Sequence, residues 1–281
     1  MDFSRINSDI KQLEGCINTP QAVSATEPLA VGIDLGTAYI VVVVLNGAGT
    51  PVGCALEYSQ VVRDGLVVDY AGAIDVVKRL VKQLEEQLGR SLEQAAIAVP
   101  PGTEKGNSKT HCYVIEGAGL EVSTVIDEPV AANAVLAIDR GVIVDIGGGT
   151  TGLAVIEDGQ VVYTADEATG GTHVSLVLAG HHRIPFAEAE KLKHDPSRQE
   201  ENLSLVRPVI QKMATIVGRH IHTWQPEEIF LVGGTCCLAG IEQVFSSELD
   251  LPVFKPENPL LVTPLGIALS DLDMSGGRDD H

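Results

Sequence analysis

The sequence is poor in cysteine, in aromatic residues and in positive charge. Its five cysteines, an odd number without a C-x-x-C pair, disfavour structural disulfides and a tetrahedral zinc site. Lysine and arginine number 19 against 38 aspartate and glutamate residues, so the net charge is −19. Nucleic acids and anionic membranes are bound through cations, and the sequence therefore predicts neither as a partner.

Long apolar segments are also missing. The run from Tyr39 to Leu45 has only strand length, far below the roughly 20 residues of a membrane-spanning helix. The first residues, "MDFSRINSDIKQ", are polar and lack the apolar core of a signal peptide. These absences predict a cytoplasmic protein, and the apolar content of 44% is enough for a substantial core.

Two stretches of the chain repeat one pattern, "VGIDLGTAYIVVVVLNGAG" at 31–49 and "VIVDIGGGTTGLAVIEDGQVV" at 142–162. Each has an apolar strand, an aspartate, a glycine-rich turn and a second apolar strand. The two aspartates, Asp34 and Asp145, are 145 − 34 = 111 residues apart. Either stretch alone could be an ordinary hairpin. A repeat at domain-sized spacing instead indicates two similar halves.

The aspartates beside these turns need a chemical explanation. Glycine lets backbone N–H groups approach an anion closely, and successive N–H groups form a phosphate-binding nest. A neighbouring carboxylate would repel phosphate unless a cation lies between them. Mg²⁺ is commonly held by one or two carboxylates, water and phosphate oxygens. We therefore expect Asp34 and Asp145 to face each other across a cleft and to hold the hydrated Mg²⁺ of a nucleotide.

Apolar strands alternate with helical patterns along the chain, which predicts an α/β fold. Apolar residues at a helical period, with Gly89 near the end, indicate a helix within 71–90. Helices are also expected over 128–139, over much of 186–224 and close to the C-terminus.

Five segments, in this order, resemble the motifs of the actin-like ATPase superfamily, which includes actin, sugar kinases, DnaK-type chaperones and MreB. They are "GIDLGTAY", "DEPVAANAVLAID", "VDIGGGTTGLAVIEDG", "IFLVGGTCCLAGIEQVF" and "TPLGIALSDL". The whole chain also resembles the chaperone-like EutJ family of ethanolamine-utilisation proteins. That likeness is carried by "VVRDGLVVDYAGA", "GLEVSTVIDEP" and "ADEATGGTHVSLVLAG".

The resemblance implies an actin-like (ribonuclease H-like) duplicated α/β fold, with two lobes around a nucleotide cleft. It also implies a division of the chain into five parts. They are an N-terminal extension (1–28), lobe I (29–140) with a C-terminal helix (262–273) packed back on it, lobe II (141–261) with a small helical subdomain (about 173–224), and a flexible tail (274–281).

The resemblance further implies ATP or ADP with Mg²⁺ as cofactors. Glu128 matches the position that activates the attacking water, with a helix N-terminal acid favoured by the macrodipole as the alternative. Asp145 and Thr150 complete the catalytic set, and Asp34 and Asp145 would hold Mg²⁺ through water. Glu190 and Lys193 match the helix that touches ribose and adenine, with solvated surface charge as the alternative. The implied nucleotide contacts are Asp34, Gly36, Thr37, Gly147, Gly148, Gly149, Thr150, Glu190, Lys193, Gly233, Gly234, Thr235 and Cys236.

The sequence departs from the superfamily at Gly152, where DnaK and MreB relatives carry an acid, and no peptide-binding β-sandwich follows. The resemblance therefore implies a slow, chaperone-like Mg-ATPase that acts on a protein partner of the ethanolamine-utilisation machinery. Such a protein would be cytoplasmic, in or near a bacterial microcompartment. The alternative is a non-hydrolysing nucleotide-binding scaffold or a filament former, so self-assembly stays open.

Overall fold

The computed structural model describes residues 3–276, and the chain forms two compact units. Unit 1 consists of Met1–Ala137 and Leu261–His281, and unit 2 of Ile138–Leu260. The predicted flexible tail at 274–281 lies outside the described residues from position 277 onward. Residues 274–276 belong to the last helix, and the flexibility of the tail stays a prediction.

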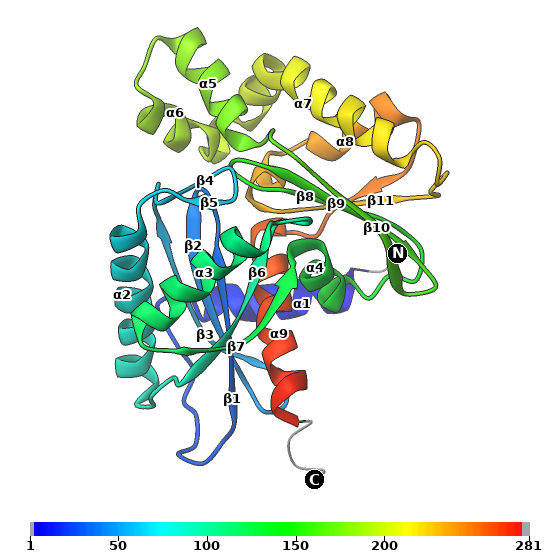
Figure 1. Ribbon diagram of the computed structural model, residues 1–281. Coiled ribbons are helices and arrows are strands. Elements are labelled where there is room, and N and C mark those ends of the chain that lie inside the picture. The colour runs from blue at the N-terminus through cyan, green and yellow to red at the C-terminus, as the bar shows by residue number, and fades with distance from the viewer. Residues whose placement is uncertain (1–2, 277–281) are drawn as a thin grey trace. The chain divides into compact units, whose positions relative to one another are not determined.

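Unit 1 contains a five-stranded mixed sheet (Figure 1). Its strand order is β3 (Pro51–Tyr58), β2 (Tyr39–Asn46), β1 (Leu29–Leu35), β6 (Gln94–Val99) and β7 (Glu121–Asp127). The pairs β1–β2 and β2–β3 are antiparallel, whereas β1–β6 and β6–β7 are parallel. A small separate hairpin joins β4 (Val62–Arg63) to β5 (Leu66–Val67).

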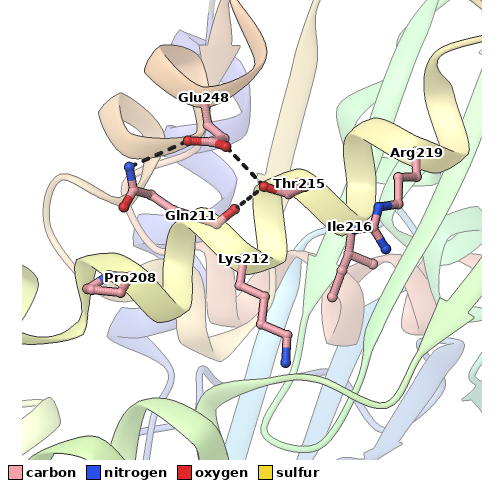
Figure 2. Close-up of a pocket in the computed structure, with 7 residues that line it drawn as sticks. All are labelled: Pro208, Gln211, Lys212, Thr215, Ile216, Arg219 and Glu248. Carbon is pink, nitrogen blue, oxygen red and sulfur yellow. Dashed lines mark hydrogen bonds between the residues drawn. The ribbon is translucent and has the colours of Figure 1, made fainter.

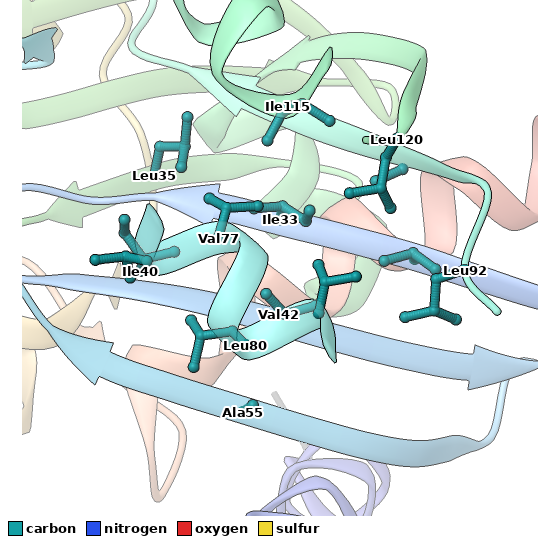
Figure 3. Packing of buried hydrophobic residues seen from close by; sticks show 14 of the residues in the cluster. Ile33, Leu35, Ile40, Val42, Ala55, Val77, Leu80, Leu92, Ile115 and Leu120 are labelled. Carbon is teal, nitrogen blue, oxygen red and sulfur yellow. The ribbon is translucent and has the colours of Figure 1, made fainter. Parts of the chain in front are cut away.

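Helices cover both faces of this sheet. The helices α2 (Tyr70–Leu88) and α3 (Lys105–Ala118) pack on one face, where Figure 3 shows sheet residues such as Ile33 against Val77 and Leu80 of α2. The helices α4 (Glu128–Leu136) and α9 (Val262–Gly276) pack on the other face. The N-terminal helix α1 (Ser4–Gly15) packs against β3.

Local sequence explains where α2 begins and ends. The Asp69 carboxylate accepts a hydrogen bond of 2.9 Å from the backbone N–H of Gly72, which satisfies one of the free donors at the helix N-terminus. Gly89 ends the helix with φ of 65°, a left-handed conformation that favours glycine. The predicted helix within 71–90 is confirmed.

Unit 2 repeats the sheet of unit 1. Its strand order is β10 (Gln160–Glu167), β9 (Thr151–Glu157), β8 (Gly141–Ile146), β11 (Ile229–Val232) and β12 (Val253–Phe254). Three antiparallel strands are again followed by two parallel ones. The equivalent order of strands, with β8 in the place of β1, supports the duplication predicted from the aspartate repeat.

The helices of unit 2 gather against the core of its sheet. They are α5 (Gly171–His182), α6 (Phe186–Lys193), α7 (Gln199–Ile221) and α8 (Ile241–Leu249), with the 3-10 turns η1 (Pro196–Arg198), η2 (Gly234–Cys237) and η3 (Pro259–Leu261). The turn η3 ends at Leu261, where the chain returns from unit 2 to unit 1. The mixed sheets and alternating helices confirm the predicted α/β class.

The repeated aspartates occupy equivalent positions. Asp34 is the next-to-last residue of β1, and Asp145 is the next-to-last residue of β8. Side chains alternate between the faces of a strand. Ile33 belongs to the α2–α3 core and Val144 to the core of unit 2, so each aspartate points to the opposite face of its sheet.

Candidate functional site

The turn between β8 and β9, Gly147–Thr150, is held by its carbonyl groups. The Gly147 carbonyl accepts hydrogen bonds from the Gly171 backbone N–H at 3.0 Å and from the Thr235 hydroxyl at 2.7 Å. The Gly148 carbonyl accepts one from the Thr172 N–H at 2.8 Å. Two backbone donors at the start of α5 are therefore used to fix this turn.

These bonds determine where the N–H groups of the turn point. A trans peptide unit is planar, and its N–H points opposite to its C=O. Because the carbonyls of Gly147 and Gly148 point toward Thr235 and α5, the N–H groups of Gly148 and Gly149 point to the opposite side. Two consecutive N–H groups on one side of a glycine turn form an anion-binding nest. The geometry therefore fits a phosphate group at this turn.

Asp145 lies beside this turn under close steric constraint. It is 7% exposed, and a Cβ atom at Gly233 would collide with its Oδ1 atom. Gly233 also has φ of 88°, which non-glycine residues rarely adopt. Any side chain at position 233 would therefore displace the Asp145 carboxylate or the β11 loop.

A pocket of about 220 Å³ lies in the same unit, at the end of α6 and beside η2. Its volume is below the roughly 300–1,000 Å³ of complete small-molecule sites, so it fits part of a ligand, such as a purine ring. It is lined by Lys193, His194, Pro196, Gln199, Gly234, Thr235, Cys237, Leu238 and Ala239.

Lys193 forms a buried ion pair at the wall of this pocket. Its Nζ atom lies 3.0 Å from both carboxylate oxygens of Glu190, and the Ser175 hydroxyl also donates to Glu190. Lys193 and Glu190 are 6% and 7% exposed, so solvated surface charge is the wrong interpretation of this pair. Burial lowers the pKa of Lys193, and the Glu190 charge acts against that shift. Partial desolvation and the neighbouring Lys193 charge lower the pKa of His194.

Gln199 and Lys255 hold the two walls of the pocket. The Gln199 amide donates to the carbonyls of Lys193 and Asp195 and accepts from the Ala239 N–H at 3.1 Å. The Lys255 ammonium donates to the carbonyls of Cys236 and Leu238 at 2.9 and 3.0 Å. The pocket is therefore formed by groups whose positions are already fixed.

In unit 1, the turn after β1 presents a smaller set of groups. A Cβ atom at Gly36 would lie 2.8 Å from the Tyr39 carbonyl and 3.7 Å from Asp34 Oδ1, so glycine allows this tight turn. Asp34 and Thr37 are half-buried. Glu128 is the first residue of α4, which covers the sheet face toward which Asp34 points. Its position also fits the macrodipole alternative, so its catalytic role stays a prediction.

The structure therefore groups the predicted residues within each unit. In unit 2, one turn and one pocket bring together the predicted residues Asp145, Gly147–Thr150, Glu190, Lys193 and Gly233–Thr235. Cys236 does not line the pocket. It is fully buried, and the exposed neighbour Cys237 lines the pocket instead.

Sequence reasoning missed several supporting residues. Gly170 and Gly171 lie so close to the β8–β9 turn that a Cβ atom at either would lie 2.8 Å or less from Gly147 O or Thr235 Oγ1. Ser175, His194 and Gln199 were also not predicted. The double glycine at the start of α5, Gly170–Gly171, was the one available signal, because adjacent glycines often mark a close backbone approach.

The carboxylates alone do not form a metal site. Within residues 3–276, no group of three or more histidine, cysteine, aspartate or glutamate side chains is arranged to hold a metal ion. A divalent cation beside Asp145 would therefore need phosphate and water oxygens as further ligands. This donor set suits Mg²⁺, which keeps water and phosphate ligands.

No helix in the described range is long and apolar enough for a membrane span.

Comparison with known proteins identifies relatives. The MreB/Mbl protein family model matches residues 55–194, and the cell division protein FtsA model matches residues 142–266. The ethanolamine utilization protein EutJ of Salmonella typhimurium is 46% identical over 256 residues, which cover 91% of this chain and 89% of that protein. Its counterpart in Escherichia coli is 44% identical over 263 residues, covering 93% and 92% of the two chains.

Solved structures agree with these relationships. The crystal structure of EutJ from Carboxydothermus hydrogenoformans has a TM-score of 0.90 and 50% identity, covering 94% of this chain and 98% of that one. MreB5 of Spiroplasma citri bound to ADP has a TM-score of 0.71 and 18% identity, covering 90% and 99% of the two chains, which shows a shared actin-like fold. With 44–50% identity over nearly the full length of its relatives, the chain belongs to the EutJ family of ethanolamine utilization proteins.

Proposed function

We propose that this protein binds ATP and ADP with Mg²⁺, hydrolyses ATP slowly and acts on a protein partner in ethanolamine utilisation. One observation carries the nucleotide part of the proposal. The carbonyls of Gly147 and Gly148 are bonded to Thr235 and to the start of α5, which directs two consecutive N–H groups to the opposite side. This nest adjoins a buried carboxylate and lies in the same unit as the pocket of suitable size.

Each group has a role in this proposal. The N–H groups of Gly148 and Gly149 bind phosphate oxygens, and Lys193 and Glu190 contact the ribose beside the pocket. Gly234, Thr235 and Cys237 contact the base. In unit 1, Asp34, Gly36 and Thr37 are the proposed phosphate contacts.

Asp34 and Asp145 hold Mg²⁺ through water in this proposal. When bound, the cation neutralises phosphate charge that would otherwise repel both carboxylates. Glu128 orients or deprotonates the attacking water, and Thr150 assists at the phosphate turn. The glycine at 152 removes an acid that DnaK and MreB relatives carry, so turnover well below the enzyme median of about 10 s⁻¹ is expected.

The relatives' name supports the biological part of the proposal. Proteins called ethanolamine utilization protein EutJ share 44–46% of their residues with this chain over nearly its full length. We infer a chaperone-like action on a partner of that machinery, in the cytoplasm or at a bacterial microcompartment. The binding-only scaffold or filament former is the second candidate, favoured by the glycine at 152.

Calorimetry on the Asp145→Asn variant tests the nucleotide site. Loss of a charge-assisted contact costs about 1.5–3 kcal/mol, so Mg-ATP affinity should fall roughly ten- to a hundredfold. Asp158→Asn is a matched control, because Asp158 is exposed and its left-handed backbone (φ of 51°) also tolerates asparagine. Equal Mg-ATP affinity in wild type and Asp145→Asn would refute the metal role. Unchanged light scattering on addition of Mg-ATP would count against the filament alternative.

A further inference from the structure

A second hollow lies on the outer face of α7, away from the nucleotide pocket. It has a volume of about 470 Å³. Six of its lining residues follow one helical stripe of α7, and the seventh comes from α8 (Figure 2). The residues are Pro208, Gln211, Lys212, Thr215, Ile216 and Arg219 of α7 and Glu248 of α8. We call this set the α7 groove.

The two edges of the α7 groove differ in charge. On the α8 edge, the Glu248 carboxylate accepts hydrogen bonds from the Thr215 hydroxyl at 3.0 Å and from the Gln211 amide at 3.5 Å. On the other edge, Lys212 and Arg219 are exposed, and neither forms an ion pair within residues 3–276. Figure 2 shows Lys212, Ile216 and Arg219 pointing to one side of α7, away from Glu248.

The two cations lie in a stretch of α7, 202–221, that contains no aspartate or glutamate. The protein has twice as many acidic as basic residues, with a net charge of −19. Most of its surface would therefore repel an acidic protein, whereas the cationic edge of the α7 groove would attract one. Nucleic acid fits less well, because the Glu248 carboxylate and the overall charge both oppose a polyanion.

The stripe also defines a spacing. Lys212 and Arg219 are seven residues apart, which is about 10.5 Å along a helix, and Ile216 lies between them on the same face. A partner helix has the same rise per residue. Acids at positions i and i+7 of that helix, with an apolar residue at i+3 or i+4, would match the two cations and Ile216.

We propose that the α7 groove binds an amphipathic helix of a partner protein with this acid–apolar–acid pattern. The helix lays its apolar residue on Ile216 and pairs its two acids with Lys212 and Arg219. This surface uses no residue of the nucleotide site, so the proposal stands whether or not the protein binds ATP.

The test uses a fluorescein-labelled, 18-residue helical peptide with two glutamates seven residues apart and a leucine four residues after the first. This length exceeds the roughly 12–15 residues below which an isolated helix is marginal in water. Fluorescence anisotropy should show binding at low salt and weaker binding at high salt. Replacing both glutamates by lysine should abolish binding. Moving the second glutamate to the opposite face of the peptide should weaken binding by at least about threefold, the effect of losing one exposed ion pair.

Variants of the protein locate the binding site. The double variant Lys212→Glu and Arg219→Glu should bind the peptide at least about tenfold more weakly, because two attractions become repulsions. Lys191→Glu, which reverses an exposed charge on α6, is the matched control and should bind normally. Zero-length carbodiimide cross-linking followed by peptide mapping should join the peptide glutamate to Lys212.

Four outcomes would overturn the proposal. The first is no peptide binding at a peptide concentration of about 1 mM, which already corresponds to a weak affinity. The second is equal affinity of the double variant and the wild type for the peptide, and the third is cross-links that avoid α7. Self-association that the double variant abolishes would also overturn it, by identifying a second copy of this chain as the occupant. Circular dichroism of the double variant confirms that lost binding is not lost folding.

Discussion

Asp145 of β8 lies directly opposite Gly152 of β9, and Gly152 in turn lies opposite Asp166 of β10. Paired residues on neighbouring strands point to the same face of a sheet, so one glycine separates two carboxylates. An acid at position 152 would place three carboxylates in one cross-strand row. Glycine at position 152 therefore avoids charge repulsion within the sheet.

Gly152→Asp should destabilise the protein more than Gly152→Asn. The two side chains have nearly the same size, so the difference reports charge, and we expect about 1 kcal/mol at pH 7. Urea denaturation of both variants measures this difference. It should shrink as the pH falls toward the ordinary aspartate pKa, because protonation removes the repulsion. Equal midpoints for the two variants at pH 7 would show that the row tolerates a third charge.

Thr235→Val should loosen the Gly147–Thr150 turn. The substitution keeps the side-chain shape but removes the 2.7 Å hydrogen bond from the hydroxyl to the Gly147 carbonyl. Loss of one buried hydrogen bond costs about 1 kcal/mol, so we expect roughly fivefold weaker ATP binding by calorimetry. Thr235→Ser keeps the hydroxyl and is the control. If valine and serine bind ATP equally well, the hydroxyl does not position the turn.

Glu128→Gln should reduce ATP turnover without weakening ATP binding. General-base catalysis contributes roughly 10²–10⁴-fold, so a tenfold loss is a cautious lower limit. Phosphate release measures turnover, and calorimetry measures binding. Glu121→Gln, at an exposed position of β7, controls for loss of negative charge in the same unit. No phosphate release by the wild type would favour the scaffold alternative.

His111→Gln should make stability less sensitive to acid. His111 of α3 is 2% exposed, and its Nδ1–H donates to the Asn107 carbonyl at 3.0 Å. Burial lowers its pKa below the ordinary value of 6.5.

Below pH 6.5 the unfolded chain therefore binds a proton that the folded protein does not. Stability falls as the pH drops through this window, by up to about 1.4 kcal/mol per pH unit. Glutamine keeps an amide donor but has no such proton, so its urea midpoint should change less between pH 7.5 and pH 5. Parallel changes in both proteins would assign the acid sensitivity to other groups.

The α/β class and the duplication of the strand–turn–strand unit could both be predicted, because each depends on patterns within short stretches of the sequence. The aspartate before each glycine turn and the apolar strands around it recur in the chain, and the strands fold as equivalents. The two-residue strands β4, β5 and β12 were not predicted, because two residues are too few to show a period.

The pocket was harder to predict, since it depends on contacts between distant segments. Nothing in "GGTCC" indicates that η2 buries Cys236 and exposes Cys237. The buried Glu190 carboxylate accepts a hydrogen bond from Ser175, which lies fifteen residues before it in the chain. Residues this far apart become neighbours only through packing of α5 against α6.

The position of α9 bears on the order in which the protein folds during synthesis. The buried Asp271 carboxylate of α9 accepts hydrogen bonds from the Val31 backbone N–H at 2.8 Å and from the Gln94 amide at 3.2 Å. The contacts of strand β1 can therefore be completed only after α9, the last helix, has been synthesised. Unit 2 is one continuous segment, Ile138–Leu260, with its own sheet and core. Domains generally fold as units during synthesis on the ribosome. Unit 2 is therefore expected to complete its folding before unit 1, although the synthesis of unit 1 begins earlier.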